Sequence, residues 1–324
     1  MRCGRPAGLV AIVGMIAAGA SATAQAPAPV HRQRFAMWTV VDILAYHPSR
    51  TVADAALAKA LDEVERLDEV LSNYEAKSDV SRLVRDARNT SIAVDSSLFE
   101  VIQKSIELSR RSGGKFDVTI GPLLKVWKKA KEESRKPTPE EIAAARRCVG
   151  YEKIELTPPD RILIRSDCVE IDLGGIGKGF AVDRAMSILK AAGIKDAVIN
   201  AGASAIAAIG APPQDKGWPV RFLESGSGSR SLLLRNASIS TSEQTGGILD
   251  PFTGSPTSDR MTVSVITPSA TVADGLSTAL LLMSIEEGKK LLEHYENTAA
   301  FWIAPGGQVK ASYGESRVAF LEQR

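Results

Sequence analysis

The residues best suited to chemistry lie in a glycine-rich stretch, Asp172–Asp183, where four glycines surround one lysine, Lys178. Glycines let backbone N–H groups approach a ligand closely, and the N-terminus of a helix attracts negative charge. A lysine at that place opposes the helix dipole, so we expect an anionic ligand to compensate it. The stretch therefore predicts a phosphate site, although it matches neither the dinucleotide-fold pattern nor the P-loop pattern. A tightly packed turn without a ligand is the alternative interpretation.

A second candidate is a pair of oxygen-bearing side chains, Asp274 and Thr278, in an apolar run that predicts a helix. Side chains four residues apart lie on one face of a helix. One carboxylate and one hydroxyl, completed by backbone carbonyls and phosphate oxygens, suit Mg²⁺. The alternative is that the aspartate complements the helix dipole and the threonine bonds back to a carbonyl. The three histidines, His31, His47 and His294, stand outside any motif, so neither a catalytic triad nor a zinc site is supported.

The elements that must position these residues are predicted from the hydrophobic pattern. Cys168–Leu173 predicts a strand before the glycines, apolar residues at helical spacing predict a helix that ends at Gly193, and 196–200 predicts the next strand. Residues 36–46 predict the first strand and 52–71 an amphipathic helix. Because helices and strands alternate irregularly, we expect the α+β class, with mixed β-sheets flanked by helices, rather than a doubly wound parallel fold.

The start of the chain differs from the rest. Arg2 and Arg5 precede an alanine-rich apolar run and small-x-small cleavage sites, which predicts a signal peptide over residues 1–26 and a periplasmic protein. We expect a flexible leader over 27–34 and one folded domain over 35–324. The 324 residues are 44% apolar with a net charge of +2, which gives no argument for nucleic-acid binding. No further run reaches transmembrane length, so no transmembrane anchor is expected.

The cysteines are informative in an exported protein. Cys3 stands in the charged start of the signal peptide and not at a lipidation position, so we do not expect a lipoprotein. Cys148 and Cys168 flank two apolar runs separated by Thr157-Pro158-Pro159-Asp160. In a hairpin with its turn near residues 158–159, the two cysteines face each other. We therefore predict a cross-strand disulfide, with two free thiols packed as small apolar groups as the alternative.

Taken in order, the motifs of this chain resemble those of the ApbE family, the FAD:protein FMN transferases. One such motif would be weak support, whereas seven in the family's order are specific. The matching segments are Ser72-x-Tyr74-x-x-x-Ser78, Phe116–Leu123, Asp172–Asp183, Asn200–Gly202, Thr241-Ser242, Asp250–Gly254 and Ala273–Thr278.

The resemblance implies a T-fold-like α+β architecture that binds FAD, with Mg²⁺ at the pyrophosphate. Tyr74 would lie near the isoalloxazine ring and Lys178 near the pyrophosphate. The full set of implied FAD contacts is Met37, Tyr74, Lys115, Phe116, Asp117, Asp172, Lys178 and Ile248. The implied metal ligands are the Gly175 carbonyl, Asp274 and Thr278. The phosphate site and the Asp274–Thr278 pair are thus indicated both by the residues and by the resemblance.

The implied activity is transfer of FMN from FAD to a threonine or serine hydroxyl of an acceptor flavoprotein, with release of AMP. The chain departs from the family pattern on the acceptor side: Gly247 replaces a histidine, the preceding loop is short, and Ser204 replaces an acid. Two alternatives therefore stay open. They are an FAD-binding protein with little or no transferase activity, and an FAD pyrophosphatase that forms FMN and AMP.

Overall fold

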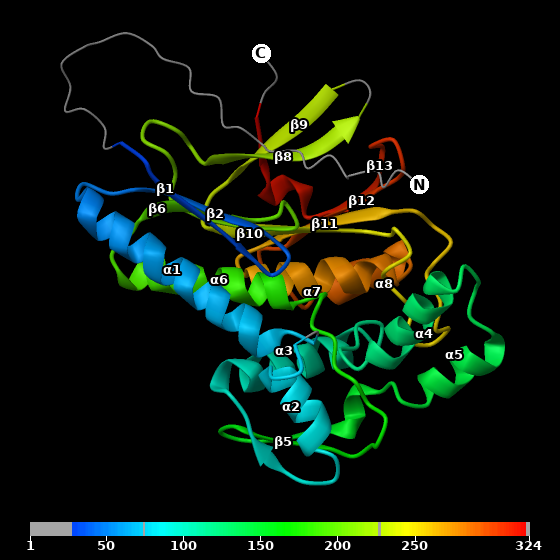
Figure 1. The fold of residues 1–324 in the computed structure, drawn as a ribbon. Coiled ribbons are helices and arrows are strands. Elements are labelled where there is room, and N and C mark those ends of the chain that lie inside the picture. Colours follow the sequence, from blue (N-terminus) through cyan, green and yellow to red (C-terminus); the bar gives the residue numbers. More distant parts are fainter. Residues whose placement is uncertain (1–27, 74, 226–227, 322–324) are drawn as a thin grey trace, which may run out of the picture.

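The computed structural model describes residues 28–73, 75–225 and 228–321, so the predicted signal peptide and Tyr74 lie outside the described residues. Helices and strands alternate irregularly along the chain, which confirms the α+β class (Figure 1). In the described part, no helix is both long and apolar enough to cross a membrane. The α-helices are α1 Arg50–Leu71, α2 Asp79–Asp86, α3 Ser96–Arg111, α4 Gly121–Glu132, α5 Pro139–Arg146, α6 Gly177–Ala191, α7 Ala270–Leu281 and α8 Ile285–Leu292.

The largest sheet has the strand order β1-β2-β6-β7-β10-β11-β12-β13, and each neighbouring pair runs antiparallel. Its strands are β1 Val30–Ala36, β2 Thr39–Tyr46, β6 Asp196–Ala201, β7 Ala205–Ile209, β10 Ala237–Glu243, β11 Thr262–Thr267, β12 Ala299–Ile303 and β13 Val309–Tyr313. Two smaller sheets have the orders β14-β9-β8 and β3-β5-β4. Their strands are β8 Trp218–Ser225, β9 Gly228–Leu234, β14 Ala319–Phe320, β3 Ile92–Ala93, β4 Ile154–Thr157 and β5 Arg161–Ile164.

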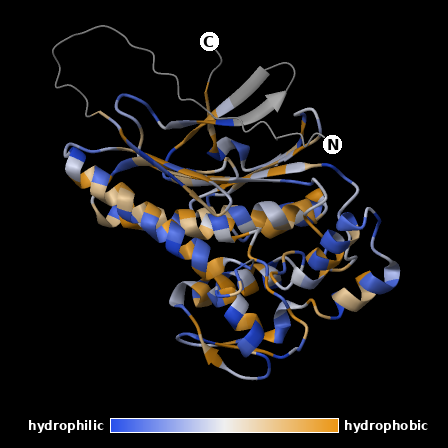
Figure 2. Cartoon of the chain, in the orientation of Figure 1, coloured by the Kyte–Doolittle hydropathy of each residue, from blue (hydrophilic) through white to orange (hydrophobic). Residues whose placement is uncertain are grey.

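The large sheet is covered on both faces. Helices α1, α6 and α7 pack on one face, and β8 and β9 lie over the other (Figure 1). Alternation along β2 divides its residues between two cores: Val41 and Ile43 join the helix-side core, whereas Leu44 packs against the smaller core, which contains Trp218. Figure 2 shows apolar and polar residues alternating along α1, and the apolar ones, among them Leu57, Leu61 and Val64, are buried. Helices α2 to α5 and the β3-β5-β4 sheet form a second layer below α7.

The first strand differs from its prediction. Residues 30–34, expected in a flexible leader, belong to β1, and the expected strand over 36–46 is the second arm of a hairpin. The polar side chains of β1 made it look like a leader, but they form ion pairs with the neighbouring helix α1. Arg32 pairs with Asp54, and Arg34 pairs with Asp62 and Glu65. Val30 and Ala36, at the two ends of β1, are buried in the core.

The glycine-rich stretch and its surroundings differ in one further element. The strand predicted over Cys168–Leu173 is an irregular segment that makes one parallel bridge, Ile120–Glu170, and one bond from the Asp172 N–H to the Val118 carbonyl at 2.7 Å. Its apolar residues are buried against helices rather than in a sheet. Helix α6 and β6 are confirmed, and Gly193 follows the helix with a left-handed φ of 81°.

The disulfide between Cys148 and Cys168 is confirmed, with the two Cα atoms 5.2 Å apart. Its predicted place within a strand ladder is wrong. The ladder of β4 and β5 begins at the Ile154–Ile164 pair, so the bridge joins the turn after α5 to the bend after β5. The bridge therefore ties α5 to the segment that enters the glycine-rich stretch.

Candidate functional site

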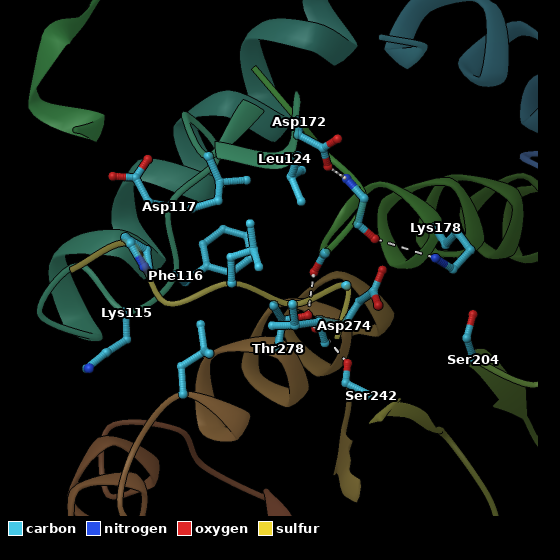
Figure 3. Close-up of a pocket in the computed structure, with 18 of the residues that line it drawn as sticks. Lys115, Phe116, Asp117, Leu124, Asp172, Lys178, Ser204, Ser242, Asp274 and Thr278 are labelled. Atoms are coloured by element: carbon cyan, nitrogen blue, oxygen red, sulfur yellow. Dashed lines mark hydrogen bonds between the residues drawn. The ribbon is translucent and has the colours of Figure 1, made fainter. Parts of the chain in front are cut away.

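The predicted site residues meet around one cavity of about 290 Å³ (Figure 3). Nine of the eleven predicted residues line it: Lys115, Phe116, Asp117, Asp172, Gly175, Lys178, Ile248, Asp274 and Thr278. Met37 does not line it, and Tyr74 lies outside the described residues. The sequence did not mark the rest of the wall as site residues: Ile120, Leu124, Gly174, Ser204, Thr241, Ser242, Gly247, Leu249, Pro251 and Leu282.

One wall of the cavity is the glycine turn that opens α6. The Asp172 carboxylate shapes this turn by accepting a bond from the Gly174 N–H at 2.8 Å and one from the Asn73 side chain at 2.6 Å. Lys178, in the first turn of α6, reaches back to the Gly174 carbonyl at 3.5 Å. A helix N-terminus and an ammonium group thus lie on the same wall, an arrangement that suits the oxygens of a phosphate group.

The corner between the glycine turn and α7 contains the three predicted metal ligands. The Thr278 hydroxyl lies 3.5 Å from the Gly175 carbonyl oxygen and 3.2 Å from the carbonyl of Asp274. The Asp274 carboxylate accepts a bond from the Gly179 N–H at 2.9 Å and one from the Ser240 hydroxyl at 3.1 Å. These contacts join α7 to the glycine turn across about a hundred positions, and Gly175, Asp274 and Thr278 all line the same cavity.

The chemistry of this corner fits a hard divalent cation. Asp274 is only 4% exposed, and burial raises the pKa of its carboxyl, opposed by the nearby charge of Lys178 and by the bonds from Gly179 and Ser240. A buried carboxylate of this kind is stabilised by a proton or by a cation. Among the described residues, no group of three His, Cys, Asp or Glu side chains could form a protein-only metal cage. One carboxylate completed by other oxygens is the usual arrangement for Mg²⁺ at a phosphate ligand.

The third wall comes from the segment between α3 and α4. Phe116 is buried and packs against Gly175, while the Asp117 carboxylate accepts bonds from Thr119 and from the Tyr151 N–H at 2.9 Å. Burial raises the pKa of Asp117, and these hydrogen bonds oppose the shift. Both carboxylate oxygens are used within the protein, so this side chain holds the wall in place.

Lys115 completes the same segment and is joined to another loop. Its ammonium lies 2.8 Å from the Asp250 carboxylate and 5.2 Å from the centre of the Phe252 ring. Asp250 in turn accepts a bond from the Phe252 N–H at 2.7 Å. The pair therefore fixes the loop that carries Gly247, Ile248 and Leu249 against the cavity. The sequence motifs contain both charges but not their pairing across 135 positions.

Hydroxyl side chains line the sheet side of the cavity. Ser242 lies 2.8 Å from Ser277 and 3.4 Å from Thr278. The Ser240 hydroxyl shares its one proton between Asp274 and the Ser204 carbonyl, which lies 2.7 Å away. The sequence singled out Thr241-Ser242 and Ser204 only as motif positions. These residues line the same cavity as Asp274 because the end of β10 and the turn between β6 and β7 lie at the same end of the large sheet.

The loop at Gly247 leaves space in the cavity. The buried Gln244 side chain holds this loop through bonds to the Ile248 carbonyl at 2.9 Å and the Thr257 hydroxyl at 3.1 Å. A Cβ atom added to Gly247 would have no heavy atom within 4 Å. The glycine therefore exposes open volume where the family pattern has a histidine.

Met37 lies on the turn of the β1–β2 hairpin, and its N–H donates to Asp68 at 2.7 Å. Its neighbour Trp38 lines a separate hollow with Ser72 and Ser78. The segment of Ser72 and the bond from Asn73 to Asp172 connect this hollow to the main cavity. Contact of Met37 and Tyr74 with FAD stays a prediction.

Fold and cavity together define an α+β protein whose site combines a helix N-terminus, a lysine and an oxygen cluster. The ApbE family model matches residues 37–302, so the chain belongs to the ApbE family. The FAD:protein FMN transferase of Treponema pallidum is 28% identical over 301 residues, 83% of this chain and 83% of that protein. The protein of the same name from Haemophilus influenzae is 28% identical over 256 residues, 72% of this chain and 73% of that protein.

Solved structures agree with this assignment. The apo form of the Pseudomonas stutzeri flavinyl transferase ApbE superposes with a TM-score of 0.78 at 25% identity, covering 89% of this chain and 95% of that one. A histidine-to-glycine mutant of the flavin transferase ApbE from Vibrio cholerae gives a TM-score of 0.80 at 26% identity, covering 88% and 97%. The resemblance inferred from the motifs is therefore confirmed.

Proposed function

We propose that this chain is a Mg²⁺-dependent FAD:protein FMN transferase that attaches FMN to a threonine or serine hydroxyl of an acceptor flavoprotein. Membership of the ApbE family supports flavin transfer. The observation that carries the finer proposal is the convergence of the glycine turn, Lys178 and the Gly175–Asp274–Thr278 corner on one cavity. A phosphate site and a cation site that adjoin each other suit a pyrophosphate substrate.

In the proposed reaction, the acceptor oxygen bonds to the FMN phosphorus, the bond from that phosphorus to the bridging oxygen breaks, and AMP departs with that oxygen. The acceptor hydroxyl loses its proton to solvent. Lys178 and the positive end of the α6 dipole would bind and orient the pyrophosphate, since the Gly174 and Gly179 N–H groups already donate to Asp172 and Asp274. Phe116 and Ile248 form an apolar wall that excludes water from that side. Bound Mg²⁺, held by Gly175, Asp274 and Thr278, would neutralise charge on the phosphate oxygens.

FAD hydrolysis is the second candidate, favoured by the open volume at Gly247. Water in that volume would replace the acceptor hydroxyl and yield FMN and AMP. Incubation with FAD, Mg²⁺ and a threonine-containing acceptor domain, followed by mass spectrometry, separates the outcomes. A covalent FMN adduct supports transfer, FMN and AMP without adduct support hydrolysis, and intact bound FAD refutes both enzymatic functions and leaves a flavin-binding protein.

The metal assignment has its own test. Asp274→Ala removes the one carboxylate of the corner, so Mg²⁺-dependent turnover should be lost. The matched control is Asp86→Ala, which removes a surface carboxylate whose partner among the described residues is its neighbour Arg85. Turnover that survives in Asp274→Ala at the level of the control would remove the metal assignment.

We also propose export to the periplasm, with residues 1–26 as a cleaved signal peptide. The Cys148–Cys168 disulfide supports it, because such bridges persist in oxidising compartments. Cell fractionation tests it: the mature chain should lack residues 1–26 and occur in the periplasmic fraction. Uncleaved protein in the cytoplasm would refute the proposal.

A further inference from the structure

Helices α6 and α7 lie side by side in the helix layer (Figure 1). Three contacts between the two segments recur about one helical turn apart. At the cavity, the Gly175 carbonyl meets the Thr278 hydroxyl. Four residues further along the α6 segment and four residues back along α7, the Gly179 N–H meets the Asp274 carboxylate. Successive contacts at this spacing define an antiparallel pair of helices with a fixed axial register.

The third contact of this series lies away from the cavity and is made by Asp183. One of its carboxylate oxygens accepts from the Ala270 N–H at 2.8 Å. The other accepts from the Ser269 hydroxyl at 2.6 Å, the Thr271 N–H at 2.9 Å and the Thr271 hydroxyl at 2.6 Å. Four donors at the N-terminus of α7 thus converge on one carboxylate of α6. Bonds to a charged acceptor are about twice as strong as neutral ones.

The close approach of the two helices leaves this register little freedom. At Gly179 an added Cβ would lie 2.7 Å from the Cβ of Asp274, a separation that side chains do not tolerate. Gly175, Asp274 and Thr278 form what we call the metal corner. Each residue advances a helix by about 1.5 Å, so a slip of one residue between α6 and α7 would move the Gly175 carbonyl out of hydrogen-bond distance of Thr278. The contacts of Asp183 therefore bear directly on the metal corner two turns away.

We propose that Asp183 is a positioning residue for the metal corner, an inference that rests on the proposed Mg²⁺-dependent function. By holding the N-terminus of α7 on α6, Asp183 sets the separation between the Gly175 carbonyl on one segment and Asp274 and Thr278 on the other. It does not touch FAD or the metal. Its loss should weaken metal binding and leave FAD binding in the absence of metal unchanged.

The test compares Asp183→Asn with Asp95→Asn. Asp95 caps α3 by accepting from the Ser97 N–H at 2.8 Å, so the control also removes a carboxylate from a helix N-terminus. Mn²⁺ binding is measured by electron paramagnetic resonance with and without FAD, and FAD binding by fluorescence without metal. For Asp183→Asn we expect roughly 10–100-fold weaker Mn²⁺ binding, the range found when outer partners of metal ligands are removed. Asp95→Asn should bind Mn²⁺ like the wild type.

A milder variant keeps the test decisive if Asp183→Asn does not fold. Thr271→Val removes one hydroxyl donor at nearly constant volume and should weaken Mn²⁺ binding in the same direction by a smaller factor. Equal Mn²⁺ affinity in wild type, Thr271→Val and any folded Asp183→Asn would overturn the positioning role. A parallel loss of metal-free FAD binding would overturn it too. A wild type that binds no Mn²⁺ with FAD present would instead refute the proposed metal-dependent function itself.

Discussion

Gly247→His is the substitution that most directly probes the chemistry of the cavity. Gly247 lines the cavity together with Lys178 and Asp274, and an added Cβ meets no heavy atom within 4 Å. Its backbone is not left-handed, so a side chain causes no strain there. Replacing a glycine at such a position reduces the freedom of the unfolded chain and stabilises the fold by about 0.4–1 kcal/mol. The variant should therefore fold at least as well as the wild type.

The expected gain in rate comes from proton transfer. Of the described histidines, none lines the cavity, and the carboxylate of Asp117 is occupied by protein donors. An imidazole that takes the proton of the acceptor hydroxyl typically contributes about 10²–10⁴-fold. We expect Gly247→His to raise the rate of FMN attachment toward this range. Because the base acts in its neutral form, the gain should be present above a pH of about 6.5 and be lost below it.

The assay is the rate of covalent FMN attachment to an acceptor domain at saturating FAD and Mg²⁺, measured by mass spectrometry between pH 5.5 and 8 (a range set by the histidine pKa of about 6.5). Gly247→Asn is the matched control, since it fills similar space without a base. Equal rates in the histidine and asparagine variants, or a gain that does not depend on pH, would refute the reasoning.

Three further predictions concern stability. Trp38 is 76% exposed and has a left-handed φ of 60°, a backbone conformation that glycine adopts more easily. In urea titrations, Trp38→Gly should therefore raise the free energy of unfolding by roughly 0.5–1 kcal/mol. A lower free energy of unfolding would show that the contacts of the Trp38 side chain outweigh the backbone cost. Replacing Cys148 and Cys168 by serine opens a loop with a sequence separation of 20 and should cost about 3 kcal/mol by the same measurement; an unchanged midpoint would contradict this. Burial raises the pKa of Asp117, so at a pH between the ordinary pKa and the raised pKa the native state binds more protons there than the unfolded state. The free energy of unfolding contributed by Asp117 therefore falls as the pH rises from the ordinary pKa through the raised pKa. In Asp117→Asn, the unfolding free energy should therefore change more positively with pH over that interval, and an unaltered pH dependence would contradict the assignment.

Much of the fold was predictable because it follows from local pattern. Helical periodicity located α1 and α6, and the apolar run 196–200 located β6. The failures share one physical cause. The β1 strand is polar in sequence, and Cys168–Leu173 is apolar, yet the first pairs in a sheet and the second does not. Pattern reports where a side chain is buried, whereas strand pairing depends on which distant segment offers backbone partners.

The sequence by itself determined the chemical groups of the site: glycines with Lys178, the Asp274–Thr278 pair on one helix face, and motifs in an order specific enough to indicate the family. Only the tertiary structure decided how they act together. The Gly175 carbonyl faces Thr278 because α6 and α7 pack in antiparallel register, and Lys115 meets Asp250 because two loops close on the same cavity. Spacing along one helix fixes a local face, but contacts across a hundred residues arise only when separate elements bury their apolar faces against one sheet.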